Sequence, residues 1–397
     1  MTGVQTCALP ILAVLYPFVH FGSEARGYAQ MTLFAYLAFA AAEDGTEGVA
    51  SARWRFGLWG ALGLASHLGS VPLMVFLAIA HALRLKLDGQ TVLQALNATV
   101  RLSGPYVAVL LAFATAFFFD LKAHDFIIPF GDSTQSCDQA SCFVEAMGEL
   151  ARSSTGGFDA GPAGFQAGLY VGLSAILTLG AVAWLGAVGN RRAIFYAVIL
   201  LGLPLLFFAA GQPTIPHGRY FLNAFAFWPL LLAEVMGELT GRSRSARALA
   251  GVALLALVTV NAWAVERFLQ SGRGDYAAAF ERITEGHGSG PLTVGTNMAF
   301  QFRMMVDDWV RREAPPFDIV VIPRGAIGEV KPEWLVTVTV PLAFMARTYC
   351  EGTQRYSLVS AHPYWGFSGA SWGVYRKVGG AIEADCPSVP HPRARFR

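Results

Sequence analysis

Two short polar segments interrupt an otherwise apolar chain, and each carries an arginine and a tyrosine. In the first, "SEARGY", Glu24 and Arg26 stand between two apolar runs and Tyr28 follows them. In the second, "HGRY", Arg219 and Tyr220 come just before another apolar run. A guanidinium group donates paired hydrogen bonds whose geometry matches the oxygens of a phosphate. The two segments together therefore predict a site for an anionic group such as a lipid phosphate.

Other polar side chains could shape this site. They are Glu24, Tyr28, His67, His217 and Tyr220. Glu24 could fix the rotamer of Arg26 or polarise an acceptor hydroxyl group, and His67 could reach the same level from the tip of a helical hairpin. A simpler interpretation also stands. Glu24 and Arg26 would then be interfacial residues, paired with each other or solvated, because charged groups cost little near the membrane surface.

The composition places most of the chain in a lipid bilayer. Of its 397 residues, 54% are hydrophobic and only 14% are charged, and the mean hydropathy is +0.45. Soluble domains carry about 25% charged residues. The net charge is only +2, and no basic stripe is interleaved with aromatic residues. Nucleic acid is therefore not an expected partner.

The first eleven residues, "MTGVQTCALPI", resemble the translation of a sequencing adapter. We interpret residues 1–11 as an assembly scar and exclude them from reasoning about the fold. The apolar run that follows, Leu12–Phe21, holds ten residues, whereas a spanning helix needs about 20. We therefore expect the natural protein to begin further upstream, with its first helices missing here. A signal peptide is the alternative, but no basic residue precedes the apolar run.

Seven further apolar stretches predict membrane-spanning segments. One of them, Phe56–Leu83, is long for a single helix and is broken at "SHLGSVP", where Gly69 and Pro72 stand. Basic residues flank it on both sides, which predicts a helical hairpin that returns to the same side. The other stretches are Gly27–Ala42, Leu102–Leu121, Phe165–Gly189, Ala193–Gly211, Tyr220–Leu239 and Ala248–Val265.

The distribution of basic residues predicts the orientation of these helices. One side receives ten of them, namely Arg53, Arg55, Arg84, Lys86, Arg101, Arg191, Arg192, Arg242, Arg244 and Arg247. The other side receives four, namely Arg26, Lys122, Arg152 and Arg219. Cytoplasmic loops carry the excess of lysine and arginine. Both polar segments, the loop 122–164 and everything after about Arg267 are therefore predicted to be extracytoplasmic.

The composition changes after the last apolar run. "GDYAAAFERITE" and "NMAFQFRMMVDDWVRRE" have helical spacing, and "PLTVGT", "FDIVVIP", "EWLVTVTV", "YSLVSA" and "SWGVYRKV" read as strands. Strands that alternate with helices favour a small α/β domain with a partly parallel sheet. We expect a transmembrane domain over residues 12–268, this α/β domain over 269–378 and a loose tail over 379–397.

Four cysteines outside the scar support the same topology. They are Cys137, Cys142, Cys350 and Cys386, and all fall in segments that the charge bias places outside. Disulfides form in oxidising compartments, so Cys137–Cys142 and Cys350–Cys386 are candidate bridges. Too few further ligands stand near "CDQASC" for a zinc site, and the acidic residues of the loop 122–164 match no calcium loop. No metal site is predicted.

The order of these segments resembles that of a known class of membrane enzymes. "SEARGYAQMTLFAYLAFAA", a hairpin with a histidine at its break, "HGRYFLNAFAFWPLLLAEV" and a span that leads into "GDYAAAFERI" are similar to the GT-C membrane glycosyltransferases. The likeness is to bacterial relatives of the dolichyl-phosphate-mannose protein mannosyltransferases, family 39, and it covers roughly Leu12 to Tyr276. It implies a polytopic α-helical membrane protein with a GT-C-like bundle, here followed by the C-terminal extracytoplasmic α/β domain.

The resemblance implies inverting transfer of a sugar from a polyprenyl-phosphate donor to an extracytoplasmic glycan, lipid or protein acceptor. Arg26 and Arg219 become candidates for the donor phosphate. No cofactor is implied besides the lipid-linked substrate, and the expected location is the inner (cytoplasmic) membrane. The key acidic residue of the family lies in the first outer loop, upstream of Leu12, so no catalytic base is assigned and this chain is expected to be inactive.

Two other functions stay open at this point. A polymerase or ligase of lipid-linked glycans would use the same kind of donor, but such enzymes have a large central outer loop and no appended α/β domain. The second alternative is a permease or an envelope scaffold without enzymatic activity. A permease is expected to place polar residues or broken helices near the middle of the membrane, whereas here the charges gather at one face.

Overall fold

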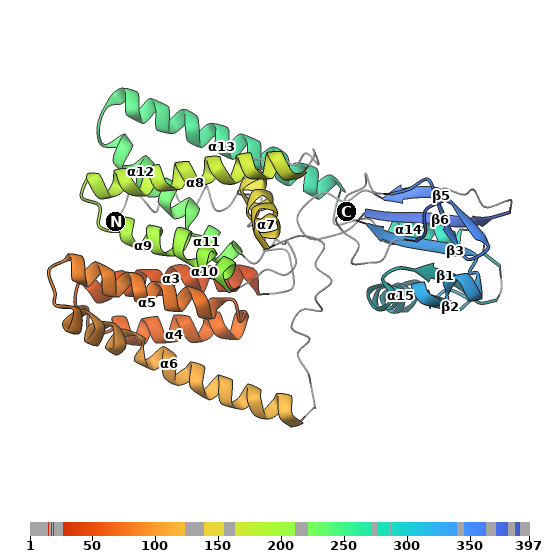
Figure 1. Ribbon diagram of the computed structural model, residues 1–397, viewed down its shortest axis with the longest axis horizontal. Coiled ribbons are helices and arrows are strands. Elements are labelled where there is room, and N and C mark those ends of the chain that lie inside the picture. Colours follow the sequence, from red (N-terminus) through yellow and green to blue (C-terminus); the bar gives the residue numbers. More distant parts are fainter. Residues whose placement is uncertain are drawn as a thin grey trace. The chain divides into compact units, whose positions relative to one another are not determined.

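The structure is a computed structural model of the chain, and Figure 1 shows its helices and strands. It describes residues 15, 17, 19, 27–123, 139–154, 163–210, 221–271, 276–285, 287–288, 290–339, 345–362, 371–379 and 386–389. The chain separates into two compact units, Met1–Val265 and Glu266–Arg397.

The described part of the first unit is helical. Its elements are α3 (Tyr28–Thr46), α4 (Ala52–Ser66), α5 (Ser70–Leu87), α6 (Val92–Ala123), α7 (Gln139–Ser154), α8 (Ala163–Ala187), α9 (Ala193–Ala197), the π-helical turn η1 (Val198–Gly202), α10 (Leu203–Ala209), α11 (Leu222–Phe225), α12 (Trp228–Thr240) and α13 (Arg244–Ser271). Apart from α7, they correspond to the apolar stretches of the sequence, with short breaks where glycine, proline or charged residues interrupt the runs.

Five helical stretches of the described chain are long and apolar enough to cross a membrane. They are Ser70–Leu87, Val92–Asp120, Gly168–Ala187, Leu222–Thr240 and Arg244–Gln270. Large apolar side chains such as Leu111, Ile176 and Leu255 are more than 60% exposed on these helices, and a soluble protein rarely exposes extended apolar surface of this kind. These features fit a membrane protein. The expected spans at α3 and α4 are not among the five, and α4 has only 15 residues. The expected span Ala193–Gly211 is not among them either, because its apolar helical stretch, Ala193–Ala209, is shorter.

The hairpin predicted in Phe56–Leu83 is present. Helix α4 ends at Ser66 and α5 begins at Ser70, and the two helices lie side by side (Figure 1). His67 caps α4 in an extended conformation, with φ −165° and ψ 131°. Pro72 falls in the first turn of α5, where its missing N–H costs no helical hydrogen bond. The break therefore exposes a short non-helical stretch at one end of two packed helices.

An aromatic cluster holds the first unit together. Phe39 of α3 contacts Phe195 of α9 and Phe227, which precedes α12, with ring centroids 5.3 Å and 5.6 Å apart in edge-to-face geometry. Tyr196 lies 6.1 Å from the same Phe39 ring. All four side chains are at most 9% exposed. Segments far apart in sequence are thus fixed against α3, which carries Tyr28 at its first turn.

Helix α7 lies in a segment that was expected to be a solvated loop. Phe143 of this helix contacts Phe208 of α10 and Phe221, with ring centroids 5.2 Å and 5.4 Å apart. The helix also packs against α8. Its apolar residues recur at helical spacing in "FVEAMGELA", and this short pattern was missed because it is surrounded by polar and small residues.

The second unit is a mixed α/β fold, as the alternating pattern predicted. Its elements are α14 (Tyr276–Thr284), β1 (Leu292–Thr296), α15 (Ala299–Glu313), β2 (Ile319–Pro323), η3 (Arg324–Ala326), α16 (Ile327–Val330), β3 (Trp334–Thr339), β4 (Thr348–Glu351), β5 (Gln354–His362) and β6 (Ser371–Val378). The strand order is β2-β1-β3-β6-β5-β4. Strands β2, β1 and β3 are parallel and the others pair antiparallel.

Both faces of this sheet are buried, which explains its apolar strands. On one face, β1, β3 and β6 pack against α14 and α15 around Phe280, Phe302 and Trp309. The opposite face buries Tyr356 and Tyr375. Burial raises the pKa of Tyr356 to about 12, and its phenol donates a hydrogen bond to the carbonyl of Pro332, 3.2 Å away.

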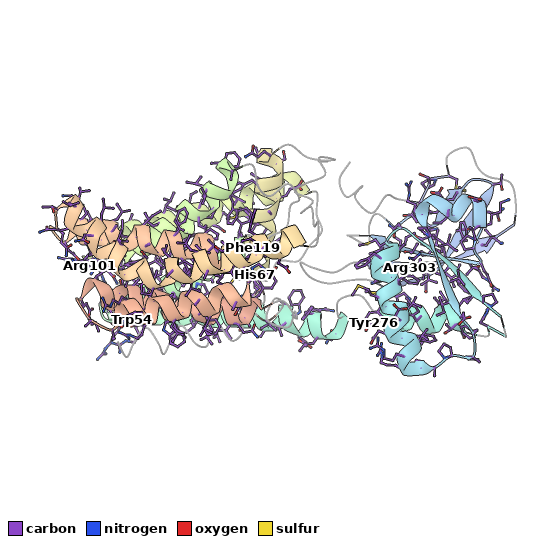
Figure 2. All side chains as sticks on the ribbon, turned by 90° about the horizontal axis from the view of Figure 1, so that it is seen from below. Trp54, His67, Arg101, Phe119, Tyr276 and Arg303 are labelled. Atoms are coloured by element: carbon purple, nitrogen blue, oxygen red, sulfur yellow. A yellow bond between two sulfur atoms is a disulfide. The ribbon has the colours of Figure 1, made fainter. Side chains whose placement is uncertain are left out.

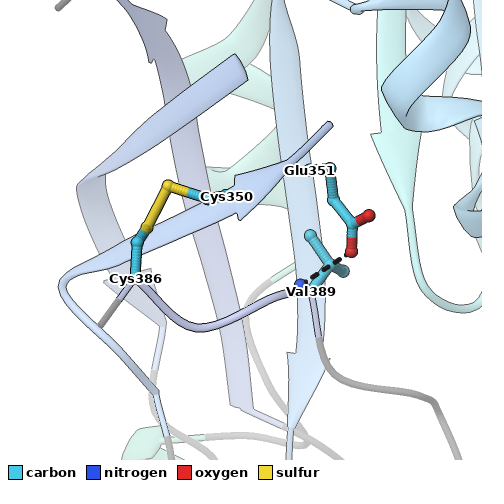
Figure 3. Close-up of a disulfide and its surroundings, with 4 residues drawn as sticks. All are labelled: Cys350, Glu351, Cys386 and Val389. Carbon is cyan, nitrogen blue, oxygen red and sulfur yellow. Dashed lines mark hydrogen bonds between the residues drawn. A yellow bond between two sulfur atoms is a disulfide. The ribbon is translucent and has the colours of Figure 1, made fainter. Parts of the chain in front are cut away.

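A disulfide attaches part of the C-terminal tail to this sheet (Figure 3). It joins Cys350 of β4 to Cys386, the pairing proposed from the sequence. The carboxylate of Glu351 accepts a hydrogen bond from the backbone of Val389, 2.9 Å away, and the Val389 side chain is fully buried. The expectation of a loose tail is therefore wrong for residues 386–389, because a covalent bond and an apolar anchor hold them.

Candidate functional site

The structure describes only some of the residues predicted to form the site. Tyr28, His67, Cys350 and Cys386 lie in described segments. Glu24, Arg26, His217, Arg219, Tyr220 and Cys137 lie outside the described residues, as does the side chain of Cys142, whose backbone belongs to α7. The proposed Cys137–Cys142 bridge and the two arginines therefore stay predictions. The described neighbours of these segments define the candidate site.

Gly27 begins the helix that carries Tyr28. Its φ of +71° places it in the left-handed region, which residues with a side chain rarely adopt. A Cβ atom at this position would also overlap the carbonyl oxygen of Ser66, the last residue of α4. Glycine is therefore required here, because the backbone that enters α3 touches the backbone that leaves α4.

Tyr28 and His67 form the centre of the candidate site. Their ring centroids lie 4.8 Å apart, at an interplanar angle of 33°. Tyr28 is only 6% exposed. The Nδ1 atom of His67 accepts a hydrogen bond of 2.9 Å from the backbone N–H of Gly69, which fixes the ring at the hairpin break. Two of the side chains selected from the sequence are therefore in contact.

Asn223 of α11 reaches the same break from a distant part of the chain. Its amide donates a hydrogen bond to the carbonyl oxygen of Gly69, across 154 positions of sequence. The side chain is 6% exposed. Asn223 follows the "HGRY" segment, and Gly27 follows "SEAR". Gly27, which follows Arg26, and Asn223, which stands three residues after Tyr220, thus contact the same stretch, residues 66–70.

Two buried polar atoms at this break have no hydrogen-bond partner among the described residues. They are the Oγ atom of Ser70 and the Oδ1 atom of Asn223. A buried polar atom without a partner costs about 1–3 kcal/mol, so such atoms in native proteins generally bind water or a ligand. Sequence reasoning missed both residues, because a serine and an asparagine beside apolar runs carry no distinctive pattern.

The contact at Gly27 leads to a prediction about stability. Gly27→Ala should destabilise the helical unit, because alanine is disfavoured by about 1–2 kcal/mol in the left-handed region and its Cβ would overlap Ser66. Gly48 is the matched control, since its φ is +78° and nothing lies within 4 Å of a built Cβ. We expect Gly27→Ala to lower the free energy of unfolding by at least about 1 kcal/mol more than Gly48→Ala. Equal effects in denaturant titrations of the two variants would contradict this contact.

A second polar cluster lies at the other end of α3. Glu43 comes fifteen residues after Tyr28, which is about 22 Å along a helix. Figure 2 shows His67 toward one end of the helical unit, and Trp54 and Arg101 toward the other. Arg101 belongs to the basic side defined from the sequence. The site at the hairpin break and the second cluster therefore occupy opposite ends of the helices.

This second cluster is an ion network between three segments. Arg192 pairs with Glu43 of α3 through Nε and with Glu234 of α12 through Nη1, the latter at 2.7 Å. The amide of Asn190 donates to the other oxygen of Glu234, 2.9 Å away. Glu43 and Glu234 are 8% and 4% exposed. A glutamate inside the apolar run "WPLLLAEV" was the signal that the sequence offered and that was not used.

The described residues contain no group of three or more histidine, cysteine, aspartate or glutamate side chains that could hold a metal ion. The candidate site at the hairpin break instead combines an aromatic ring, an imidazole, an amide and a hydroxyl group. Such a set can hydrogen-bond a polyhydroxylated ligand. Comparison of the chain with protein-family models, with curated protein sequences and with solved structures gave no match.

Proposed function

We propose that this chain is part of an integral-membrane glycosyltransferase that takes a sugar from a polyprenyl-phosphate donor. The donor phosphate would bind Arg26 and Arg219, and the sugar would lie against the hairpin break. The acceptor would be an extracytoplasmic glycan, lipid or protein, which the second unit would help to position. The proposal includes a multi-pass location in the inner membrane, with the hairpin break and the second unit on the extracytoplasmic side.

One observation carries this proposal. Arg26 is bonded to Gly27, whose backbone touches that of Ser66. Arg219 stands four residues before Asn223, whose amide binds the carbonyl oxygen of Gly69. Gly27 and Asn223, almost 200 positions apart, thus contact the same hairpin break. This arrangement is what two arginines need in order to bind a single phosphate, because the reach of a guanidinium group is limited to a few ångströms.

The chemistry requires cationic groups at this place. In the transfer, the bond between the anomeric carbon and the phosphate oxygen breaks, and a bond to the acceptor oxygen forms. The electron pair of the broken bond stays on the lipid phosphate, so arginine side chains stabilise the charge that develops there. The proton of the acceptor hydroxyl passes to a carboxylate base. That base is not assigned to a residue of this chain.

The unpaired atoms at the break support a sugar as the bound group. A hydroxyl group of a hexose can donate to Oδ1 of Asn223 and can exchange a hydrogen bond with Oγ of Ser70. The ring of Tyr28 packs against His67, whose Nδ1 atom binds the backbone of Gly69 at the same break. Water can satisfy the same two atoms when the site is empty.

Donor binding is the experiment that tests the proposal. A photoreactive polyprenyl phosphate should label the purified protein, and unlabelled polyprenyl phosphate should compete, whereas polyprenol without the phosphate should not. Arg26→Gln and Arg219→Gln should each lower labelling about tenfold, because each removes a charge-assisted hydrogen bond worth roughly 1.5–3 kcal/mol. Arg101→Gln is the control, since this exposed arginine lies toward the opposite end of the unit.

Two results would count against the proposal. If polyprenol competes as well as polyprenyl phosphate, the binding depends on the lipid chain and not on the phosphate. If the three glutamine variants are labelled equally, the two arginines do not hold the donor. In either case a scaffold without donor binding would become the better interpretation.

A permease is the second candidate, and the ion network favours it. Ionisable residues inside membrane helices often mark paths for protons or substrates, and Glu234 lies within the candidate span Leu222–Thr240. The π-helical turn η1 also interrupts the helical stretch formed by α9 and α10. Proteoliposomes that contain the protein would then take up a substrate, and Glu234→Gln would abolish this uptake without changing polyprenyl phosphate binding. Such a result would favour this function over glycosyl transfer.

A further inference from the structure

A cavity of about 450 Å³ opens between the end of α5, the end of α8 and the start of α9. It belongs to the end of the first unit that carries the excess of basic residues, away from the hairpin break. Its polar lining consists of Arg84, Asp88, Asn190 and Arg191, and the rest is glycine and aliphatic side chains. This volume is in the range of pockets that hold small molecules.

The carboxylate of Asp88 pairs with both arginine side chains that line this cavity. Asp88 accepts a hydrogen bond from Nε of Arg84 at 3.0 Å and also pairs with Nη1 of Arg191. The two guanidinium groups are thus held side by side, with a net charge of +1 for the three groups. The Nη1 atom of Arg84 is buried and has no hydrogen-bond partner among the described residues. The arrangement therefore has donor groups left for an anion.

The remaining walls suit an acyl chain and not a soluble metabolite. Val182 and Gly186 of α8 and Ile194 of α9 line the cavity, and Leu87 at the end of α5 is 71% exposed. Both α5 and α8 contribute candidate membrane spans, Ser70–Leu87 and Gly168–Ala187. Charged groups at the ends of two spans, above an apolar wall, match an amphiphile with an anionic head.

We propose that this cavity binds the phosphate headgroup of an anionic phospholipid from the leaflet on the basic side. Arg84 and Arg191 hold the phosphate, and an acyl chain runs along Val182 and Ile194. Basic pockets between membrane helices on the cytoplasmic side are typical sites for anionic headgroups. The inference rests on the membrane location of the helices and is independent of the proposed sugar transfer, because the two sites share no residue.

Lipid retention tests this inference. Dioleoylphosphatidylglycerol and dioleoylphosphatidylcholine are added to the purified protein in detergent, and bound lipid is counted by native mass spectrometry. The wild type should retain phosphatidylglycerol in preference to phosphatidylcholine. Arg191→Gln should weaken retention of phosphatidylglycerol about tenfold, and its side chain is 62% exposed, so folding should be unaffected. Arg101→Gln, outside the cavity, should retain the lipid normally.

A second pair of variants changes the shape of the cavity without changing its charge. A Cβ atom built at Gly186 or at Gly180 meets nothing within 4 Å, and both residues lie on α8, but only Gly186 lines the cavity. Gly186→Leu should therefore reduce retention of phosphatidylglycerol, and Gly180→Leu should not. Equal effects of these two variants would overturn the assignment of the lipid to this cavity.

Two further outcomes would also overturn the inference. Equal retention of the two lipids by the wild type would show that no anionic headgroup is recognised. Complete displacement of phosphatidylglycerol by inorganic phosphate would show that the acyl chain contributes nothing, and a soluble phosphate compound would replace the lipid as the occupant. Labelling by the photoreactive polyprenyl phosphate should be the same in Arg191→Gln as in the wild type, which separates this test from that of the proposed function.

Discussion

Arg192→Met is expected to lower the free energy of unfolding of the helical unit by about 3–5 kcal/mol. Arg192 is the only cation that the described contacts place against both Glu43 and Glu234. Its removal would leave the two buried carboxylates without their shared ion-pair partner, and a buried charge without a partner is costly. Denaturant titration in detergent, followed by tryptophan fluorescence, measures this loss.

Neutralising the carboxylates tests whether charge is the cause. Adding Glu43→Gln and Glu234→Gln to Arg192→Met should restore much of the stability, because a neutral network leaves no unpaired buried charge. Arg101→Met is the control for loss of a surface cation, and it should change stability by less than about 0.5 kcal/mol. If Arg192→Met behaves like this control, the network does not hold α3, the start of α9 and α12 together.

Replacing Cys350 and Cys386 by alanine is expected to destabilise the second unit by about 4 kcal/mol. The two residues are 36 positions apart, and closing a loop of this length lowers the entropy of the unfolded chain by roughly that amount in the chain-entropy account. Hydrogen exchange of peptides from β1 to β6, followed in rising urea on the whole protein, measures the effect. Reduction of the wild type with dithiothreitol should reproduce it.

The other cysteine pair provides the control for this prediction. Alanine at Cys137 and Cys142 should leave exchange in the β1–β6 peptides unchanged, since these residues belong to the first unit. Free thiols at Cys350 and Cys386 in protein purified without reductant would contradict the prediction. They would also count against an extracytoplasmic second unit, because disulfides persist in oxidising compartments.

The proposed phosphate site depends on residues next to the hairpin break. The arginines proposed to bind the donor, Arg26 and Arg219, lie outside the described residues, and their role stays a prediction. The structure contributes the contacts next to them, at Gly27 and Asn223. The proposed phosphate site therefore joins two arginine segments recognised in the sequence with the contacts that Gly27 and Asn223 make at the hairpin break.

The sequence alone determined the features that depend on local patterns. Apolar runs gave the helices of the first unit except α7, and Gly69 and Pro72 marked the hairpin break. Short apolar segments gave five of the six strands. The missed strand, β4, has four residues and lies at the edge of the sheet, where it pairs with β5 and forms a single bridge to Ser388. Such patterns act over a few residues, so they can be read without knowing the neighbours.

Only the tertiary structure decided which distant residues meet. Arg192 pairs with Glu43 across 149 positions, and Asn223 binds Gly69 across 154. No local rule links such residues, because their contacts depend on how whole helices pack. The attachment of residues 386–389 to the sheet has the same origin. The elements were thus set by short-range preference, and the candidate sites were set by packing between elements.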